Sequence, residues 1–189
     1  MDMNRRSLGL GALGLAAAGL PLTLASPALA DPRQRLVERA RTDLNLLLQE
    51  EPRSRLFDAK CRAVLVFPSI LKAGFIFGGE TGNGVLLDRN GAPLDFYNLS
   101  GGSWGLQIGG QDFSYALFFM TDSSMNYLHR VDGFAIGTGP SVVVLNKGAA
   151  ASADSTTLSH DVYAFPFNGK GLMADLTLQG TKITRIHPR

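Results

Sequence analysis

The hydrophobic pattern of the chain changes its period once, near Lys60. Before that point, apolar residues recur every three or four positions, a spacing that predicts an amphipathic helix over about residues 32–50. Asp31 and Pro32 form a favourable start, with Asp31 as N-cap and Pro32 at the first helical position. The apolar side of this helix carries Leu36, Val37, Ala40, Leu44, Leu47 and Leu48. The other side is basic and carries Arg35, Arg39 and Arg41. A second short helix is predicted over residues 53–59.

After Lys60 the apolar runs become short, rich in β-branched and aromatic residues, and separated by glycine or proline. Strands are predicted at 63–67, 74–77, 84–87 and 94–97, with a hairpin at Asn90-Gly91. Alternation at 104–108 and 113–115, and further runs at 134–136, 141–145, 162–167, 172–178 and 183–186, predict more strands. One short helix is predicted at 122–130 and a surface loop at 147–159. Eleven glycines between Gly74 and Gly110 indicate bends, bulges or close backbone approach in a curled sheet.

These elements predict an α+β fold. An N-terminal amphipathic helix is followed by a predominantly antiparallel, barrel-like or sandwich-like β domain with one short inserted helix.

Residues 1–30 differ from the rest of the chain and read as a secretory signal. Arg5 and Arg6 precede an apolar run from Leu8 to Leu24, and Ala28-Leu29-Ala30 is typical of a cleavage site. The arginine pair also resembles a twin-arginine signal, which exports folded chains. We therefore expect a periplasmic or secreted protein whose folded domain spans residues 31–189.

The amino-acid composition narrows the range of possible functions and ligands. The 18 basic and 16 acidic side chains are nearly balanced, which argues against a nucleic-acid partner. A single cysteine, Cys61, excludes an intramolecular disulfide and paired thiol ligands for zinc. The three histidines have no metal-binding spacing, so we expect neither a metal nor another cofactor.

One motif suggests catalysis. Residues 101–105 fit the pattern G-x-S-x-G, and Ser103 could be paired with His160 and Asp161, or with His187 and Asp132, in a small serine hydrolase. That motif requires a helix after the serine, whereas the alternation that follows Ser103 predicts a strand. We therefore expect a protein that is not an enzyme, with Ser103 in a local backbone role.

Several separated motifs resemble, in order, the SYLF domain family. They are residues 59–60, 66–69 (Val-Phe-Pro-Ser), 72–75 (Lys-Ala-Gly-Phe), 78–80 (Gly-Gly-Glu), 82–86 (Gly-Asn-Gly-Val-Leu), 101–109, 117–122, 170–174 and 178–183. The resemblance covers about residues 35–187 and is loose between Gly137 and His160. It implies a lipid-binding module that associates with phospholipids. Eukaryotic members bind phosphoinositides, some fungal members bind actin, and bacterial members occur as exported single domains.

Basic residues near strand ends and on the predicted helix could then contact lipid phosphates. The candidate lipid-binding residues are Arg35, Arg39, Arg41, Lys60, Lys72, Arg89, Lys170 and Lys182. Two alternatives stay open at this point. The apolar side of the helix either inserts into a membrane or packs on the β domain, and Lys60 and Lys72 could instead be partners of Asp58 or Glu80. A protein-interaction scaffold that touches no lipid is a further alternative.

The signal-peptide interpretation predicts a mature protein that begins at Asp31. Mass spectrometry of the periplasmic fraction should find that N-terminus. Changing Arg5 and Arg6 together to lysine should block export if the twin-arginine route is used. Recovery of intact Met1 in the membrane fraction would contradict the interpretation.

Overall fold

The computed structural model describes residues 31–74, 77–104, 109–130, 133–145, 158–169, 178 and 180–188. Its three helices are α1 (Pro32–Glu50), α2 (Ser54–Lys60) and α3 (Asp122–Leu128). The long strands are β1 (Ala63–Gly74), β2 (Phe77–Leu87), β3 (Pro93–Trp104) and β4 (Gly109–Phe119). The shorter strands are β5 (Phe134–Ala135), β6 (Val142–Val144), β7 (Val162–Phe167) and β8 (Thr181–Ile186). The α+β class predicted from the sequence is confirmed.

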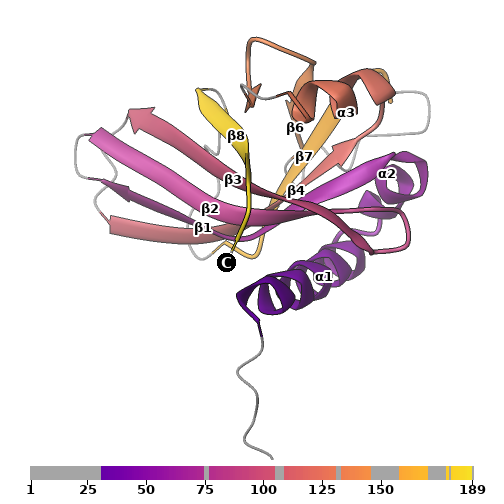
Figure 1. The fold of residues 1–189 in the computed structure, drawn as a ribbon, viewed down its shortest axis with the longest axis horizontal. Helices are drawn as coiled ribbons and strands as arrows, with labels where there is room; N and C mark the ends of the chain where they lie inside the picture. The colour runs from indigo at the N-terminus through magenta and orange to yellow at the C-terminus, as the bar shows by residue number, and fades with distance from the viewer. Residues whose placement is uncertain are drawn as a thin grey trace, which may run out of the picture.

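The strands form one sheet in the order β5-β8-β3-β2-β1-β4-β7-β6, and the sheet curls into a half-barrel (Figure 1). All pairings in it are antiparallel except β6 with β7, where Val142 lies opposite Val162 in a parallel pair. The sheet is therefore mixed. The 17 residues between these two strands, 145–161, supply the longer return connection that a parallel pair requires.

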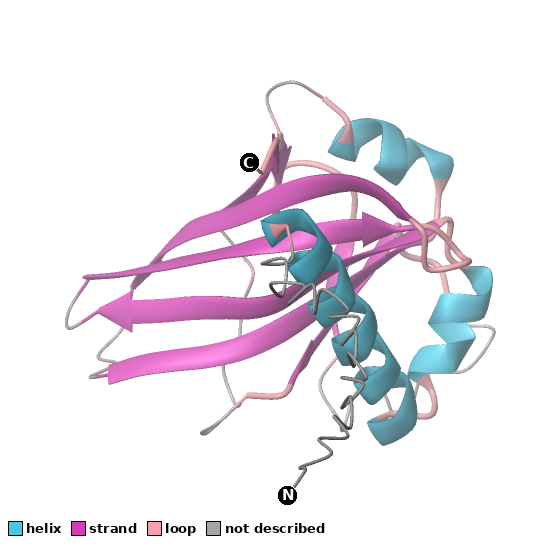
Figure 2. Cartoon of the chain, turned by 60° about the horizontal axis from the view of Figure 1, so that its bottom comes forward, coloured by secondary structure: helices cyan, strands magenta, loops and turns pink. Residues whose placement is uncertain are grey.

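Helix α1 lies across one face of the sheet, which we call the outer face (Figure 2). The Asp31 side chain accepts a hydrogen bond from the Arg33 backbone N–H, as predicted for the N-cap. Val37, Ala40, Leu44 and Leu47 are buried, and they share a core with residues of β1, β2, β4 and β7. The apolar side of the helix packs on the β domain, which settles the alternative left open by the sequence.

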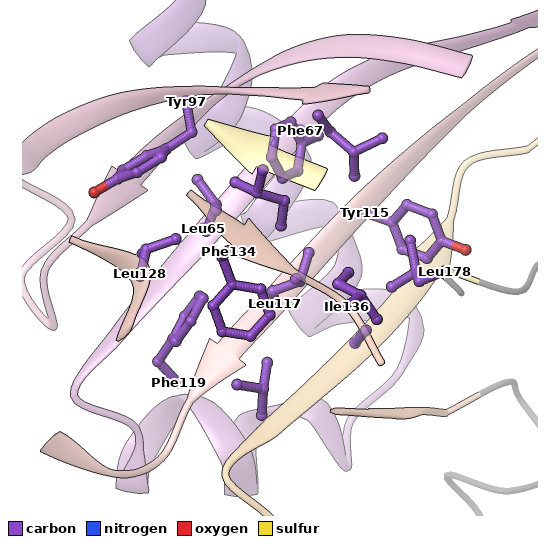
Figure 3. Packing of buried hydrophobic residues seen from close by; sticks show 14 of the residues in the cluster. Leu65, Phe67, Tyr97, Tyr115, Leu117, Phe119, Leu128, Phe134, Ile136 and Leu178 are labelled. Carbon is purple, nitrogen blue, oxygen red and sulfur yellow. The ribbon is translucent and has the colours of Figure 1, made fainter. Parts of the chain in front are cut away.

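The opposite, inner face of the sheet holds a second core (Figure 3). Leu65, Phe67 and Leu117 from the central strands meet Phe134 from β5 and Leu128 from α3 there. Phe119 and Phe134 contact edge to face, with ring centroids 5.8 Å apart. The curl of the sheet thus encloses this core between its two edges.

Glycines predicted to separate strands lie inside β2 instead. Gly82 and Gly84 face the irregular part of β1, where the pairing register shifts between Val66 and Leu71. A Cβ on Gly82 would lie 2.5 Å from the Ser69 carbonyl oxygen, and one on Gly84 would lie 2.5 Å from the Phe67 ring. These glycines permit close approach at a bulge, as their density indicated, but they do not end a strand.

Most other predicted elements that fall in the described residues are found. The strand predicted at 74–77 is wrong, because Gly74 ends β1 and Phe77 begins β2, and the one predicted at 104–108 has only Trp104, the end of β3, among the described residues. The hairpin turns at Asn90-Gly91, where Gly91 has a φ of 76°. The Thr121 side chain caps α3 by accepting from the Ser124 N–H. Most of the predicted loop at 147–159 and of the predicted strand at 172–178 lies outside the described residues.

The packing of α1 gives a test. Leu47 is 1% exposed, so Leu47→Ala should lower the free energy of unfolding by about 2–5 kcal/mol through lost burial and a residual cavity. The same truncation at Leu94, which is 54% exposed, should change it by about 0.5 kcal/mol or less. Denaturant unfolding measures both. Equal effects at the two positions would show that α1 does not pack on the sheet.

Candidate functional site

The structure separates the predicted lipid-binding cations into distinct environments. Five are exposed and come from α1, α2 and the turn between β2 and β3: Arg35, Arg39, Arg41, Lys60 and Arg89. These elements meet on the α1 side of the molecule, where they line one hollow (Figures 1 and 2). The end of α2 also approaches α3, because Arg62, two residues after Lys60, pairs with Asp122 of α3 at 3.1 Å. Lys182 is exposed on β8, beside Ala135 of β5 at the other edge of the sheet. Lys170 lies outside the described residues.

Lys72 does not belong with the exposed cations. It is 9% exposed and faces Glu80 across the β1–β2 pair, and Glu80 is 6% exposed. Burial raises the pKa of Glu80, and the charge of Lys72 partly opposes that rise. The side chain of Lys72 is therefore a structural partner of Glu80, and its proposed contact with lipid phosphate is withdrawn.

Two of the exposed arginines border the same hollow. It lies between α1, α2 and the β2–β3 turn and has a volume of about 280 Å³. The Nε–H of Arg41 donates to the Gly91 carbonyl oxygen at 2.8 Å. Arg89 donates through Nη2 to the Ala59 carbonyl oxygen at 2.9 Å. Both guanidiniums are thereby fixed by backbone carbonyls at the rim.

Two carboxylates also line this hollow, together with Asn45 and Asn90. Asp58 is half-buried, and burial raises its pKa while Arg89 lowers it to a smaller extent. The Asp88 Oδ1 atom accepts from the Asn90 N–H at 2.8 Å and the Ala92 N–H at 2.7 Å. The sequence did not single out Asp88 as a binding residue, and it offered Asp58 only as a partner for a lysine. No local pattern indicated that they would meet Arg41.

A second hollow, of about 350 Å³, lies on the other flank of α1 beside Arg39. Its polar groups are largely bonded to one another. Ser114 Oγ donates to the Pro68 carbonyl oxygen at 2.8 Å and lies 3.3 Å from an Asp43 oxygen, while Asp112 accepts from Ser69 Oγ at 2.7 Å. These bonds hold α1 and β4 together and leave the first hollow as the better candidate for a ligand.

Neither of the two predicted serine-hydrolase triads is assembled. Ser103 lies in β3 opposite Gly78, at the end of the sheet where Gly74 pairs with Gly109. Residues 160–161 precede Val162, which pairs with Phe119, ten residues further along β4. At about 3.3 Å per residue, the two ends are roughly 30 Å apart along the strand.

The second triad fails for a similar reason. His187 follows Ile186, which pairs with Phe96, seven residues before Ser103 on β3. Asp132 lies outside the described residues. The hydrolase alternative is therefore wrong for the combinations that the sequence allowed.

Two other titratable groups in the described ranges have structural partners. His129 Nδ1 lies 3.0 Å from the Tyr97 hydroxyl oxygen. Hydrogen bonds from Ser141 and Thr121 lower the pKa of Asp161. Among the described residues there is no group of three or more His, Cys, Asp or Glu side chains arranged to hold a metal ion. No helix among them is long and apolar enough to cross a membrane.

Comparison with known proteins identifies the class. A family model named Ysc84, described as "Las17-binding protein actin regulator", matches residues 100–187. This is the model of the SYLF domain family, so the resemblance that the sequence motifs show to this family is confirmed over residues 100–187. A search of curated proteins found no match.

The buried pair of Lys72 and Glu80, which lies outside the hollow, gives a second test. Lys72→Met leaves the Glu80 carboxylate buried beside no cation, so it should lower the free energy of unfolding by roughly 3 kcal/mol near pH 8. The pKa of Glu80 is higher in the folded variant than in the unfolded chain, so the folded state binds the proton more tightly. The free energy of unfolding of the variant should therefore fall as the pH rises from the unfolded pKa through the raised folded pKa, and it should recover on acidification.

The double variant Lys72→Met/Glu80→Gln is the control, because it removes both charges. It should be more stable than Lys72→Met at pH 8 and show less pH dependence. Chemical unfolding at several pH values measures the set. A Lys72→Met variant with wild-type stability at pH 8 would show that the pair is solvated.

Proposed function

We propose that this protein is a non-enzymatic lipid-binding module that associates peripherally with anionic phospholipid. The observation that carries the proposal is the gathering of exposed cations from α1, α2 and the β2–β3 turn on one side of the molecule. The match of residues 100–187 to the SYLF family model is consistent with this role. The signal-like residues 1–30 support action in the periplasm or outside the cell.

The attachment we propose is made by side chains at the surface and not by an inserted helix. The buried positions of α1, Val37, Ala40, Leu44 and Leu47, are used in the outer core. An exposed cation contributes about 1 kcal/mol near an anionic membrane, and this attraction fades over about 8 Å at physiological ionic strength. Acidic residues such as Glu38 and Glu50 lie among the cations of α1, so contact has to be close and salt-sensitive.

The test removes three exposed cations and leaves in place Arg41 and Arg89, whose side chains donate hydrogen bonds to backbone carbonyl oxygens. Arg35→Gln/Arg39→Gln/Lys60→Gln should weaken binding to phosphatidylglycerol vesicles by about tenfold to a hundredfold, because each lost charge removes part of the attraction. Vesicle co-sedimentation at several salt concentrations measures the loss. Binding of the wild type should itself weaken as salt is raised.

A matched control removes the same charge elsewhere. Arg62→Gln/Arg130→Gln/Lys182→Gln changes three cations outside the proposed surface: Arg62 is paired with Asp122 of α3, Arg130 lies over the Tyr127 ring, and Lys182 lies beside β5. This variant should bind nearly as the wild type does. Equal losses in the two triple variants would mean that net charge alone governs binding. Absence of vesicle binding by the wild type would overturn the proposal and favour the protein-interaction alternative, since the family description names binding to a protein, Las17.

A further inference from the structure

We infer that the hollow between α1, α2 and the β2–β3 turn binds a phosphodiester head group that carries a primary ammonium, as in phosphoethanolamine. This inference rests on the proposed function and gives it a head-group preference. The hollow offers two guanidiniums for the phosphate, Arg41 and Arg89, and two carboxylates, Asp58 and Asp88. A zwitterion matches this balance better than a simple anion, because each of its charges finds an opposite charge.

The cationic side of the site is preorganised. Arg41 reaches the Gly91 carbonyl from α1, and Arg89 reaches the Ala59 carbonyl from the turn, so the two residues are held from different elements. Each of these bonds uses one N–H of a group that has five. A guanidinium fixed in this way loses little freedom when it binds a phosphate with its planar fork of donors.

The anionic side is suited to an ammonium group. Asp88 is oriented by two backbone N–H groups of its own turn. Asp58 is half-buried with its pKa raised, which means that its surroundings compensate its charge incompletely. An ammonium with three N–H donors would supply the missing compensation and would be bound in return.

The size and the apolar lining of the hollow further limit the ligands that fit it. At about 280 Å³ it lies at the lower end of the range for small-molecule sites, which suits a head group better than a large polyphosphate. Leu44, Leu48 and Leu87 line it beside the charged groups. The lining contains no aromatic residue, whereas quaternary ammonium groups are recognised by aromatic cages. Phosphoethanolamine should therefore be preferred to phosphocholine.

The experiment compares vesicles that have the same surface charge and differ only in their zwitterionic lipid. Vesicles contain a fixed fraction of phosphatidylglycerol, and the remainder is either phosphatidylethanolamine or phosphatidylcholine. We expect the wild type to bind the ethanolamine vesicles about fivefold more tightly, since the two added ion pairs are partly exposed. Equal binding to the two vesicles would overturn the inference and leave the proposed function standing. Failure to bind either would overturn both.

Two variants separate the site from general effects of ethanolamine lipids on the bilayer. Asp58→Asn should abolish the preference while it keeps attraction to phosphatidylglycerol, and it should fold, because burial already favours an uncharged side chain there. Arg89→Lys should also reduce the preference, because it keeps the charge and loses the fork. Glu38→Gln, with the same change of charge on an exposed part of α1, is the matched control and should retain the preference.

Soluble head groups distinguish a lipid ligand from a free one. Glycerophosphoethanolamine should compete with ethanolamine vesicles, and glycerophosphocholine should not. Competition together with vesicle preference assigns the site to the lipid. Binding of the soluble compound without a vesicle preference would support the pocket and overturn its membrane role. A preference that survives Asp58→Asn would overturn the site itself.

Discussion

Burial of the central strands on both faces is the constraint on which the rest of this structure depends. Along β1, Leu65 and Phe67 face the inner core while Val64 and Val66 face the outer core. Along β4, Leu117 and Phe119 alternate with Ala116 and Phe118 in the same way. A strand that is apolar on both sides cannot leave either face in water. One face is therefore enclosed by the curl of the sheet, and the other needs a helix.

The need for that helix decides how α1 can function. An amphipathic helix with a basic side is equally suited by pattern to a membrane surface and to a protein core. Here the outer face of β1, β2 and β4 takes the apolar side, so the arginines are the part left for solvent and ligands. The same packing brings the second half of α1 against α2 and the β2–β3 turn, where the mixed-charge hollow forms.

The cations of this domain consequently fall into different physical classes. Arg35 and Lys60 are exposed and can act at a distance through their charge. Arg41 and Arg89 are tethered to carbonyl oxygens and can act by shape as well as by charge. Lys72 is buried against Glu80 and belongs to the fold. A list of basic residues along the sequence does not distinguish these classes, although they predict different responses to substitution and salt.

Local physics was sufficient to predict several elements from the sequence. The period of α1, its Asp31 cap, the Asn90-Gly91 turn and the apolar runs of single strands each depend on residues close together in the chain. Pattern and turn chemistry therefore identify them. The structural role of Gly82 and Gly84 was less clear from the sequence. Glycine serves both to end strands and to allow close approach, and the partner that decides between these roles, the bulge of β1, is more than ten residues away.

Only the tertiary structure decided which charges meet. Asp58 and Arg89 are thirty-one positions apart in the chain, Arg41 reaches Gly91 across fifty, and no local pattern records either proximity. The burial of Lys72 likewise depends on the register that places Glu80 opposite it. The sequence by itself determined the class of fold, the kinds of charged group and the resemblance to the SYLF family. The arrangement of those groups into a site required the long-range packing of a helix on a sheet, because charges separated along the chain acquire a common environment only when the core brings them together.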